Sequence, residues 1–348
     1  MSAVSPGTGR APGTALMRDA GIAVPLICGA MYPCSNPELV AAVSDAGGIG
    51  IVQPISLSFV HGRPLRDGLR FIRTLTNAPI GFNALIESSS RRYHERMVSW
   101  VDIALEEGVR FFVTSLGKPR WVVDAVHAAG GVVYHDVTER RWALKARDSG
   151  VDGLIAVNAR AGGHAGPLGA AALLDDVADL GLPVVCAGGV GSAAEFAAAL
   201  AMGYSGVQMG TRFIATTECN AHPRYKQAIL DAVESDVVLT ERLTGVPVAV
   251  LNTPYVQRLG LRAGPIARRL LRHPRTKHWM RSWYGLSSLV RLKRTSRGGD
   301  LSRDYWQAGG SVANIHELVA AGAVVRDCAR AAGYDLDQAA NDPEIREA

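Results

Sequence analysis

Short apolar runs alternate with segments of helical spacing along most of the chain. The apolar runs are continuous rather than alternating in polarity, which is typical of parallel strands that are covered on both faces. They lie at 24–29, 48–52, 79–84, 109–114, 131–135, 151–157, 183–187 and 205–209. The helical segments between them lie at 36–46, 64–75, 91–107, 119–129, 139–149, 169–180 and 191–202. This alternation predicts an α/β fold built on a parallel sheet.

Two strand ends rich in glycine decide between the two common forms of such a sheet. Gly188-Gly189 follows the seventh strand, and Gly210-Thr211 follows the eighth. Glycine lets the backbone approach a ligand closely, and the first turn of the next helix offers N–H groups that suit a phosphate. A (β/α)8 TIM barrel holds phosphate after these two strands, whereas an open doubly wound sheet normally binds it after the first. The sequence therefore predicts a barrel with a phosphorylated cofactor or substrate.

The rest of the chain is predicted to form appendages to this barrel. Residues 1–13 are polar and rich in Gly and Pro, and they lack the apolar core of a signal peptide, so we expect a flexible N-terminus. The barrel is predicted over 14–250, and a C-terminal helical segment that returns to it over 304–348. Helices are expected at 222–236 and at about 312–332.

Between these parts lies a basic, aromatic-containing insert, predicted over 251–303. From Arg242 to Gly299 there is no Asp or Glu, and this stretch carries 13 of the 37 Lys and Arg residues. It could receive the phosphates of coenzyme A or NADPH, or the acidic face of a carrier protein. Alternatively, its arginines form a solvated helix face, or pair with acidic groups of the same chain or of a second subunit in a homodimer.

The cysteines and the hydropathy indicate where the protein works. The five cysteines are scattered, and no pair has the spacing of zinc ligands, which favours a reducing, cytoplasmic setting without a metal centre. No apolar run approaches the length of a membrane span.

A histidine follows the sixth strand in a loop with little side-chain bulk. The loop runs from Asn158 to Gly166, and His164 stands between two glycine-containing pairs. At the carboxyl end of a barrel strand such a residue faces the active-site mouth, and histidine accepts a proton near neutral pH. We therefore predict that His164 is a general base.

The loop Ala161-Gly162-Gly163-His164-Ala165-Gly166 resembles the signature of the nitronate monooxygenase (2-nitropropane dioxygenase-like) flavoproteins. Further segments resemble the same family in the same order, and the likeness spans about residues 22–250 and 304–330. These segments are Pro37–Ser44 with Gly47–Gly50, Gly81-Phe82-Asn83, Ala187–Val190, Met209–Thr216 and Trp306–Gly309.

The resemblance implies a (β/α)8 barrel with bound FMN that oxidises alkyl nitronates with dioxygen, His164 taking a proton from the substrate carbon. Residues at the strand ends would contact the flavin: Gly29, Ala30, Met31, Asn83, Asn158, Gly162 and Gly163. Others would hold its phosphate: Gly188, Gly189, Gly210 and Thr211. At Asp136 some relatives carry a lysine, so the carboxyl would instead orient a side chain or a ribityl hydroxyl. His135 is a second candidate acid or base.

Two other functions fit parts of the sequence. FMN-dependent enoyl-acyl-carrier-protein reductases share the Gly-Gly-His loop, so reduction of an acyl thioester or a quinone by NAD(P)H is the alternative. A remote alternative is a nucleic-acid or membrane-surface protein that uses Trp279, Trp283 and Tyr284 for stacking or anchoring. It leaves the glycine turns and His164 unexplained, so we expect no nucleic-acid partner.

Overall fold

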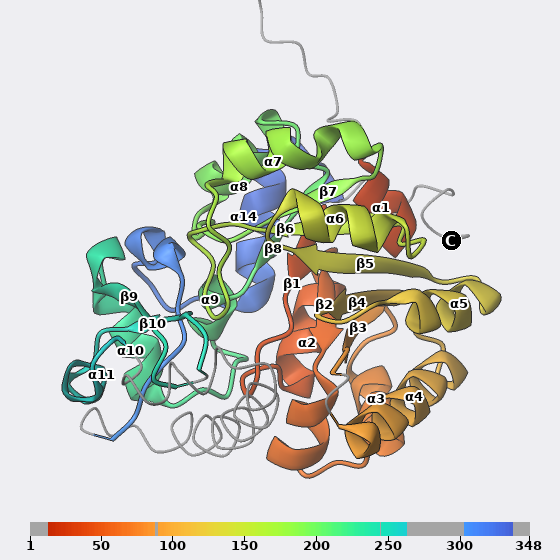
Figure 1. Cartoon of the computed structure of the whole chain (residues 1–348), viewed down its shortest axis with the longest axis horizontal. Coiled ribbons are helices and arrows are strands. Elements are labelled where there is room, and N and C mark those ends of the chain that lie inside the picture. Colours follow the sequence, from red (N-terminus) through yellow and green to blue (C-terminus); the bar gives the residue numbers. More distant parts are fainter. Residues whose placement is uncertain (1–12, 88–89, 244, 263–302, 337–348) are drawn as a thin grey trace, which may run out of the picture.

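The computed structural model describes residues 13–87, 90–243, 245–262 and 303–336. Eight parallel strands form a closed barrel in the order β1 to β8, and β1 pairs with β8 through Ile27 and Gln208 (Figure 1). The strands are β1 Leu26–Cys28, β2 Ile49–Val52, β3 Ile80–Leu85, β4 Phe111–Ser115, β5 Val132–Val137, β6 Gly153–Val157, β7 Val184–Ala187 and β8 Gly206–Met209. The predicted TIM barrel is confirmed, and the open sheet is excluded.

The outer helices follow the strands one by one, each inside a segment of predicted helical spacing. They are α2 Pro37–Asp45, α3 Leu65–Leu75, α4 Arg91–Glu106, α5 Arg120–Ala128, α6 Arg140–Arg147, α7 Ala170–Val177 and α8 Ala193–Ala201. Helix α8 begins with a capping box, in which Ser192 accepts from the Glu195 amide and the Glu195 carboxylate accepts from the Ser192 amide.

Side chains that alternate along the strands fill the inside of the barrel. Ile27, Ile51, Tyr134 and other inward residues pack together, and the short helix α1 (Ala15–Ala20) closes the amino-terminal end beneath them. The Tyr134 hydroxyl donates a 2.7 Å hydrogen bond to Asp19 of α1. The barrel is therefore a packed core that is open to chemistry only at the carboxyl ends of its strands.

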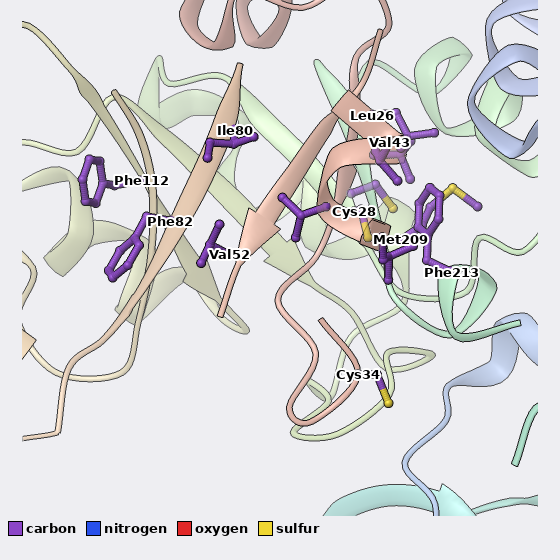
Figure 2. Close-up of a cluster of buried hydrophobic side chains, with 14 of the residues drawn as sticks. Leu26, Cys28, Cys34, Val43, Val52, Ile80, Phe82, Phe112, Met209 and Phe213 are labelled. Atoms are coloured by element: carbon purple, nitrogen blue, oxygen red, sulfur yellow. The ribbon is translucent and has the colours of Figure 1, made fainter. Parts of the chain in front are cut away.

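Outward-facing residues of the strands form a second apolar layer against the helices. Figure 2 shows part of this layer, where Leu26, Cys28 and Met209 lie near Val43 of α2. Phe213 of α9 (Thr211–Ile214) joins the same cluster, so the helix that follows β8 is anchored by buried apolar contacts.

The structure differs from the sequence prediction beyond β8. An antiparallel hairpin of β9 (Val237–Thr240) and β10 (Val248–Leu251) was not predicted. Of the helix expected over 222–236, α10 covers Pro223–Asp231, and a separate 3-10 turn follows at Glu234–Asp236.

The helix expected over about 312–332 is also divided. A 3-10 helix covers Gly310–Asn314, and α14 begins only at Ala321 and ends at Ala331. The intervening chain is extended because it pairs with the end of α9: the Thr217 amide donates to the Val319 carbonyl, and Arg212 donates to the Glu317 carbonyl. Tertiary hydrogen bonds thus override the helical spacing here.

Part of the predicted appendages lies outside the described residues. This applies to most of the N-terminal segment, to 263–302 of the basic insert with Trp279, Trp283 and Tyr284, and to 337–348. The described start of the insert forms α11 (Pro254–Leu259). Within the described ranges, no helix has the length and apolar character required to cross a bilayer.

Candidate active site

Three polar side chains point into the barrel at the carboxyl ends of the strands. Asn83 lies between outward-facing Phe82 and Ala84, so it faces inward. Gln208 faces inward for the same reason, since Val207 and Met209 on either side belong to the outer layer. Asp136 lies two residues beyond inward-facing Tyr134 on β5.

Two of these side chains present acceptor atoms that are not satisfied by the protein. The Asp136 Oδ1 and the Gln208 Oε1 are buried and have no hydrogen-bond partner among the described residues. A buried, unpaired acceptor is costly, so it indicates a ligand that donates hydrogen bonds. Gln208 was missed by the sequence analysis, although a polar residue inside an apolar strand just before Gly210-Thr211 was an available signal.

Burial raises the pKa of Asp136 from its ordinary value of 3.8 to about 7. Part of the residue reaches solvent, but its Oδ1 does not. The carboxyl therefore carries a proton in mildly acidic solution. At higher pH it is charged, and this buried charge lowers the stability of the ligand-free protein.

We predict that Asp136→Asn stabilises the free protein above pH 7. The folded state binds the Asp136 proton more tightly than the unfolded state, so the wild-type contribution to stability falls as pH rises from about 4 to about 7. An amide of the same shape carries no charge and does not lose this stability. Urea unfolding at pH 5 and pH 8 measures the effect. An advantage of the variant that does not grow between these pH values contradicts the assignment.

The turns after β7 and β8 present backbone amides that are not used by the protein. Within the described residues, the amides of Gly189, Gly210 and Thr211 donate no hydrogen bond. Gly210 and Thr211 open helix α9, whose dipole favours an anion at this end. The Thr211 hydroxyl accepts from the Gly309 amide at 3.1 Å and keeps its own proton to donate.

Gly188 is required by the packing of the protein itself. Its φ is +111°, and a Cβ there would lie 2.6 Å from the Ala161 nitrogen and 2.7 Å from the Asn158 Oδ1. The turn after β7 therefore packs directly against the loop that carries His164.

Asn158 joins these two turns instead of exposing its amide to the barrel mouth. Its Nδ2 donates to the Gly188 carbonyl at 2.8 Å, and its Oδ1 accepts from the Arg160 amide at 2.9 Å. The side chain is buried. Its contact with a flavin, implied by the resemblance, stays a prediction.

The first strand ends beside the eighth. The Gly29 amide donates to the Met209 carbonyl at 3.0 Å, and a Cβ on Gly29 would lie 3.0 Å from the Gln208 side chain. A Cβ on Gly210 would lie 3.6 Å from the Met31 sulfur. Gly29, Ala30 and Met31 thus border the same region as Gly210.

The His164 loop is clamped on both sides by segments from the end of the chain. Gly163 and Ala249 of β10 exchange two backbone hydrogen bonds. A Cβ on Gly162 would lie 3.0 Å from the backbone of Ala308 and Gly309, so the loop packs tightly against that segment. Glycine at these positions fits the close approach of two backbones.

His164 itself is exposed, whereas burial lowers its pKa below the ordinary 6.5. Protein atoms lie around the imidazole and lower its pKa, while part of the side chain stays open to solvent. The side chain is then neutral at pH 7 and accessible to a substrate, as a general base requires.

His135 has a different environment. It is buried, its Nδ1 lies 2.8 Å from the Thr114 Oγ1, and burial lowers its pKa to about 4. It lies one position away from inward-facing Asp136 on β5, so it faces the outer layer. The structure favours a packing role over an acid or base role.

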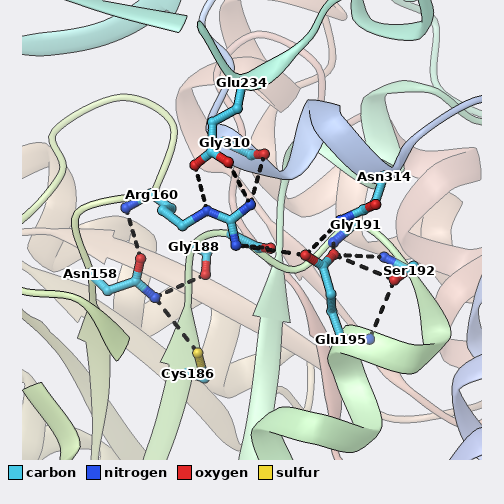
Figure 3. A network of polar contacts seen from close by, with 11 residues as sticks. Asn158, Arg160, Cys186, Gly188, Gly191, Ser192, Glu195, Glu234, Gly310 and Asn314 are labelled. Atoms are coloured by element: carbon cyan, nitrogen blue, oxygen red, sulfur yellow. Dashed lines mark hydrogen bonds and ion pairs between the residues drawn. The ribbon is translucent and has the colours of Figure 1, made fainter. Parts of the chain in front are cut away.

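A second missed residue, Arg160, holds the loops of the site together. Figure 3 shows its guanidinium beside Glu234 and the Gly310 carbonyl. The guanidinium also donates to the Gly189 carbonyl. No motif in the sequence indicated this, because its partners are 29 to 150 residues away.

Taken together, the residues fit a ligand with an anionic end at α9 and hydrogen-bond donors near Asp136 and Gln208. An FMN phosphate and ring meet these two requirements. Among the described residues, no group of three or more His, Cys, Asp or Glu side chains could hold a metal ion.

The sequence matches the family model for nitronate monooxygenase over residues 14–327. It is 32% identical, over 71% of this chain and 67% of the relative, to the (3aS,4S,5R,7aS)-5-hydroxy-7a-methyl-1-oxo-octahydro-1H-indene-4-carboxyl-CoA dehydrogenase of Rhodococcus jostii (strain RHA1). It is 26% identical, over 68% of this chain and 77% of the relative, to a probable nitronate monooxygenase of Staphylococcus saprophyticus. The chain thus spans about two thirds of the length of the dehydrogenase.

Solved structures agree with these matches. FabK from Thermotoga maritima is 28% identical, with a TM-score of 0.76 over 94% of this chain and 98% of that chain. The nitroalkane oxidase from Streptomyces ansochromogenes, at 23% identity, shows the same fold, with a TM-score of 0.74 over 94% of this chain and 99% of that chain. Since the family match covers most of the sequence, the chain belongs to the nitronate monooxygenase family, and it is a flavin-dependent oxidoreductase.

Proposed function

We propose that the protein binds FMN and oxidises alkyl nitronates with dioxygen, with His164 as the general base. The observation that carries this proposal is the placement of a neutral, accessible histidine on a clamped loop, beside a turn with free amides. When a nitroalkane is the substrate supplied, the nitronate would form in the site as the carbon next to the nitro group loses a proton, and a neutral imidazole is suited to take that proton.

Each part of the barrel mouth would have its own role. Gly188, Gly189, Gly210 and Thr211 would hold the phosphate of FMN, and Asn83, Asp136 and Gln208 would contact its ring. When bound, FMN supplies the two-electron redox chemistry. Gly162 and Gly163 keep side-chain bulk away from the ring, and the fixed loop keeps the His164 imidazole in one place. Because the imidazole is neutral, it takes up the substrate proton and later returns it to solvent.

The proposal extends to the location and the partners of the protein. A cytoplasmic location agrees with the five cysteines, which are all free. We also propose that the partners are small molecules rather than nucleic acid, since the site lies in the barrel mouth. The homodimer suggested by the basic insert stays a prediction.

A second function is favoured by a specific comparison. The relative from Rhodococcus jostii is named as a dehydrogenase of a CoA thioester, and it is 32% identical to this chain. Transfer of electrons between an acyl thioester or a quinone and NAD(P)H would use the same flavin and the same His164 loop. Anaerobic reduction of the FMN-loaded protein separates the two functions. Reduction by a nitronate but not by NADH or NADPH supports the first, and rapid reduction by a nicotinamide supports the second.

We expect the flavin-free apoprotein to bind FMN at least about 100-fold more tightly than riboflavin. Riboflavin lacks the phosphate, so it cannot use the free amides of Gly189, Gly210 and Thr211. Each charge-assisted hydrogen bond contributes about 1.5–3 kcal/mol, so one or two such bonds already give roughly this ratio. Quenching of flavin fluorescence on titration measures both dissociation constants. Equal affinity for the two flavins would remove the phosphate from the proposed site.

A further inference from the structure

Arg160 connects segments that the chain places far apart. It follows β6 by three residues and stands at the start of the His164 loop. Its Nε and Nη2 donate to the two carboxylate oxygens of Glu234 at 2.6 and 3.1 Å. Its Nη1 donates to the Gly189 carbonyl at 3.2 Å, and its Nη2 also donates to the Gly310 carbonyl at 3.2 Å. Figure 3 shows this arrangement.

The backbone of Arg160 is fixed as firmly as its side chain. Its amide donates to the Asn158 side chain at 2.9 Å, and its carbonyl accepts from the Gly310 amide at 2.8 Å. The guanidinium also lies 3.6 Å from a carboxylate oxygen of Glu195, the residue that caps α8. Both ends of the residue therefore join the His164 loop to other parts of the barrel mouth.

These contacts reach both halves of the proposed phosphate site. Gly189 belongs to the first half, the turn after β7. The guanidinium holds its carbonyl, and its amide donates to no group among the described residues. Gly309, next to the held Gly310, donates to the Thr211 hydroxyl of the second half. One planar side chain thus fixes the relative positions of the two turns.

We propose that Arg160 is a positioning residue that aligns the two phosphate-binding turns with each other and with the His164 loop. This inference rests on the proposed function. Arg160 contacts the carbonyl side of Gly189, so it acts through the turn rather than as a ligand of the phosphate. A fork of fixed geometry suits this task better than the single ammonium of lysine.

An exposed ion pair is in general worth little, so the test needs a matched control. Arg140 provides one, because its guanidinium also makes a two-pronged ion pair, with Asp179 at 2.5 and 2.7 Å, and donates to the Asp176 carbonyl. The two arginine side chains are 40% and 39% exposed. Arg140 joins α6 to the segment after α7 and has no contact with the two turns.

The experiment measures the dissociation constants of FMN and riboflavin, and the melting temperature, for the wild type, Arg160→Ala and Arg140→Ala. Loss of alignment weakens one or two phosphate hydrogen bonds, so Arg160→Ala should raise the FMN dissociation constant by about 10- to 100-fold. The riboflavin constant should stay within about 2-fold, because riboflavin does not use these turns. Arg140→Ala should leave both constants unchanged.

Arg160→Lys carries the test if the alanine variant fails to fold. Lysine keeps the charge but cannot hold Glu234, Gly189 and Gly310 at once, so we expect an FMN-specific loss of about 3- to 10-fold. An unchanged ratio of FMN to riboflavin affinity in the Arg160 variants, or an equal change in Arg140→Ala, overturns the inference and leaves the proposed function standing. A wild-type protein that binds neither flavin overturns both.

Discussion

Replacing His164 with glutamine should lower kcat for nitroalkane oxidation by roughly 100- to 10,000-fold, the range expected when a general base is lost. Glutamine has a similar size and keeps hydrogen-bonding capacity, but it does not accept a proton near neutral pH. FMN should remain bound, because the proposed phosphate site consists of the backbone amides of Gly189, Gly210 and Thr211 and does not include the His164 side chain. Stopped-flow reduction of the FMN-loaded variant by nitroalkane gives the rate, and fluorescence titration gives the FMN affinity.

The pH dependence of kcat/KM tests whether His164 must be unprotonated for turnover. Burial lowers the pKa of His164 from its ordinary value of 6.5, so the base form is lost as the pH falls through the lowered pKa, and the acid-side decrease of wild-type kcat/KM should lie below the pH expected for a free histidine. The variant should lack this decrease.

His127→Gln is a suitable control for the histidine substitution. His127 lies in the last turn of α5, which leads to the amino end of β5, whereas the His164 loop follows the carboxyl end of β6; the His127 ring is 2.9 Å from Asp152. It should keep wild-type turnover. A His164→Gln enzyme whose turnover stays within a few-fold of wild type would remove the histidine from the mechanism.

The barrel could be predicted because its signals are local. Continuous apolar strands such as 183–187, with Gly or Pro at most junctions, leave few folds open. The capping box at Ser192 and Glu195 was readable for the same reason, since its residues are three apart. The order of the strands then follows from the rule that strand–helix–strand connections are right-handed and join neighbours.

The clamp around the His164 loop could not be predicted because its contacts are between distant segments. The β9–β10 hairpin contacts Gly163 through Ala249, and the same strand pairs with the chain near Gln307. Tyr225 stacks on Trp306, with ring centroids 5.3 Å apart, and donates to the Gln307 carbonyl. No periodicity in the sequence indicates such pairing. The apolar run at 248–251 is too short to distinguish a strand from a helix or a loop.

The glycines at the strand ends have two physical roles that the sequence alone does not separate. In the part of the chain that the structure describes, nothing accepts from the amides of Gly189, Gly210 and Thr211, as an anion site requires. Gly188 instead leaves no space for a side chain, because the His164 loop occupies that space. The proposed phosphate binding and the loop packing would therefore share one turn, and we expect a change at Gly188 to affect both.

We therefore expect Gly188→Ala to destabilise the protein by about 3 kcal/mol or more and to abolish FMN binding at micromolar concentrations. The backbone at φ +111° is strained for any residue with a Cβ, and that Cβ would collide with the Ala161 nitrogen and the Asn158 Oδ1. The turn after β7 must move away from the His164 loop, which displaces the free amide of Gly189. Urea unfolding measures the stability, and fluorescence titration measures the binding.

Gly181→Ala separates strain from collision. Gly181 has a φ of +72°, and nothing lies within 4 Å of a Cβ placed there, so this variant should lose only about 1 kcal/mol and keep full FMN affinity. If the two variants lose equal stability, the collision with the His164 loop does not contribute to the loss in unfolding free energy. If Gly188→Ala binds FMN as tightly as the wild type, the turn after β7 does not hold the phosphate, and the site must lie elsewhere in the barrel mouth.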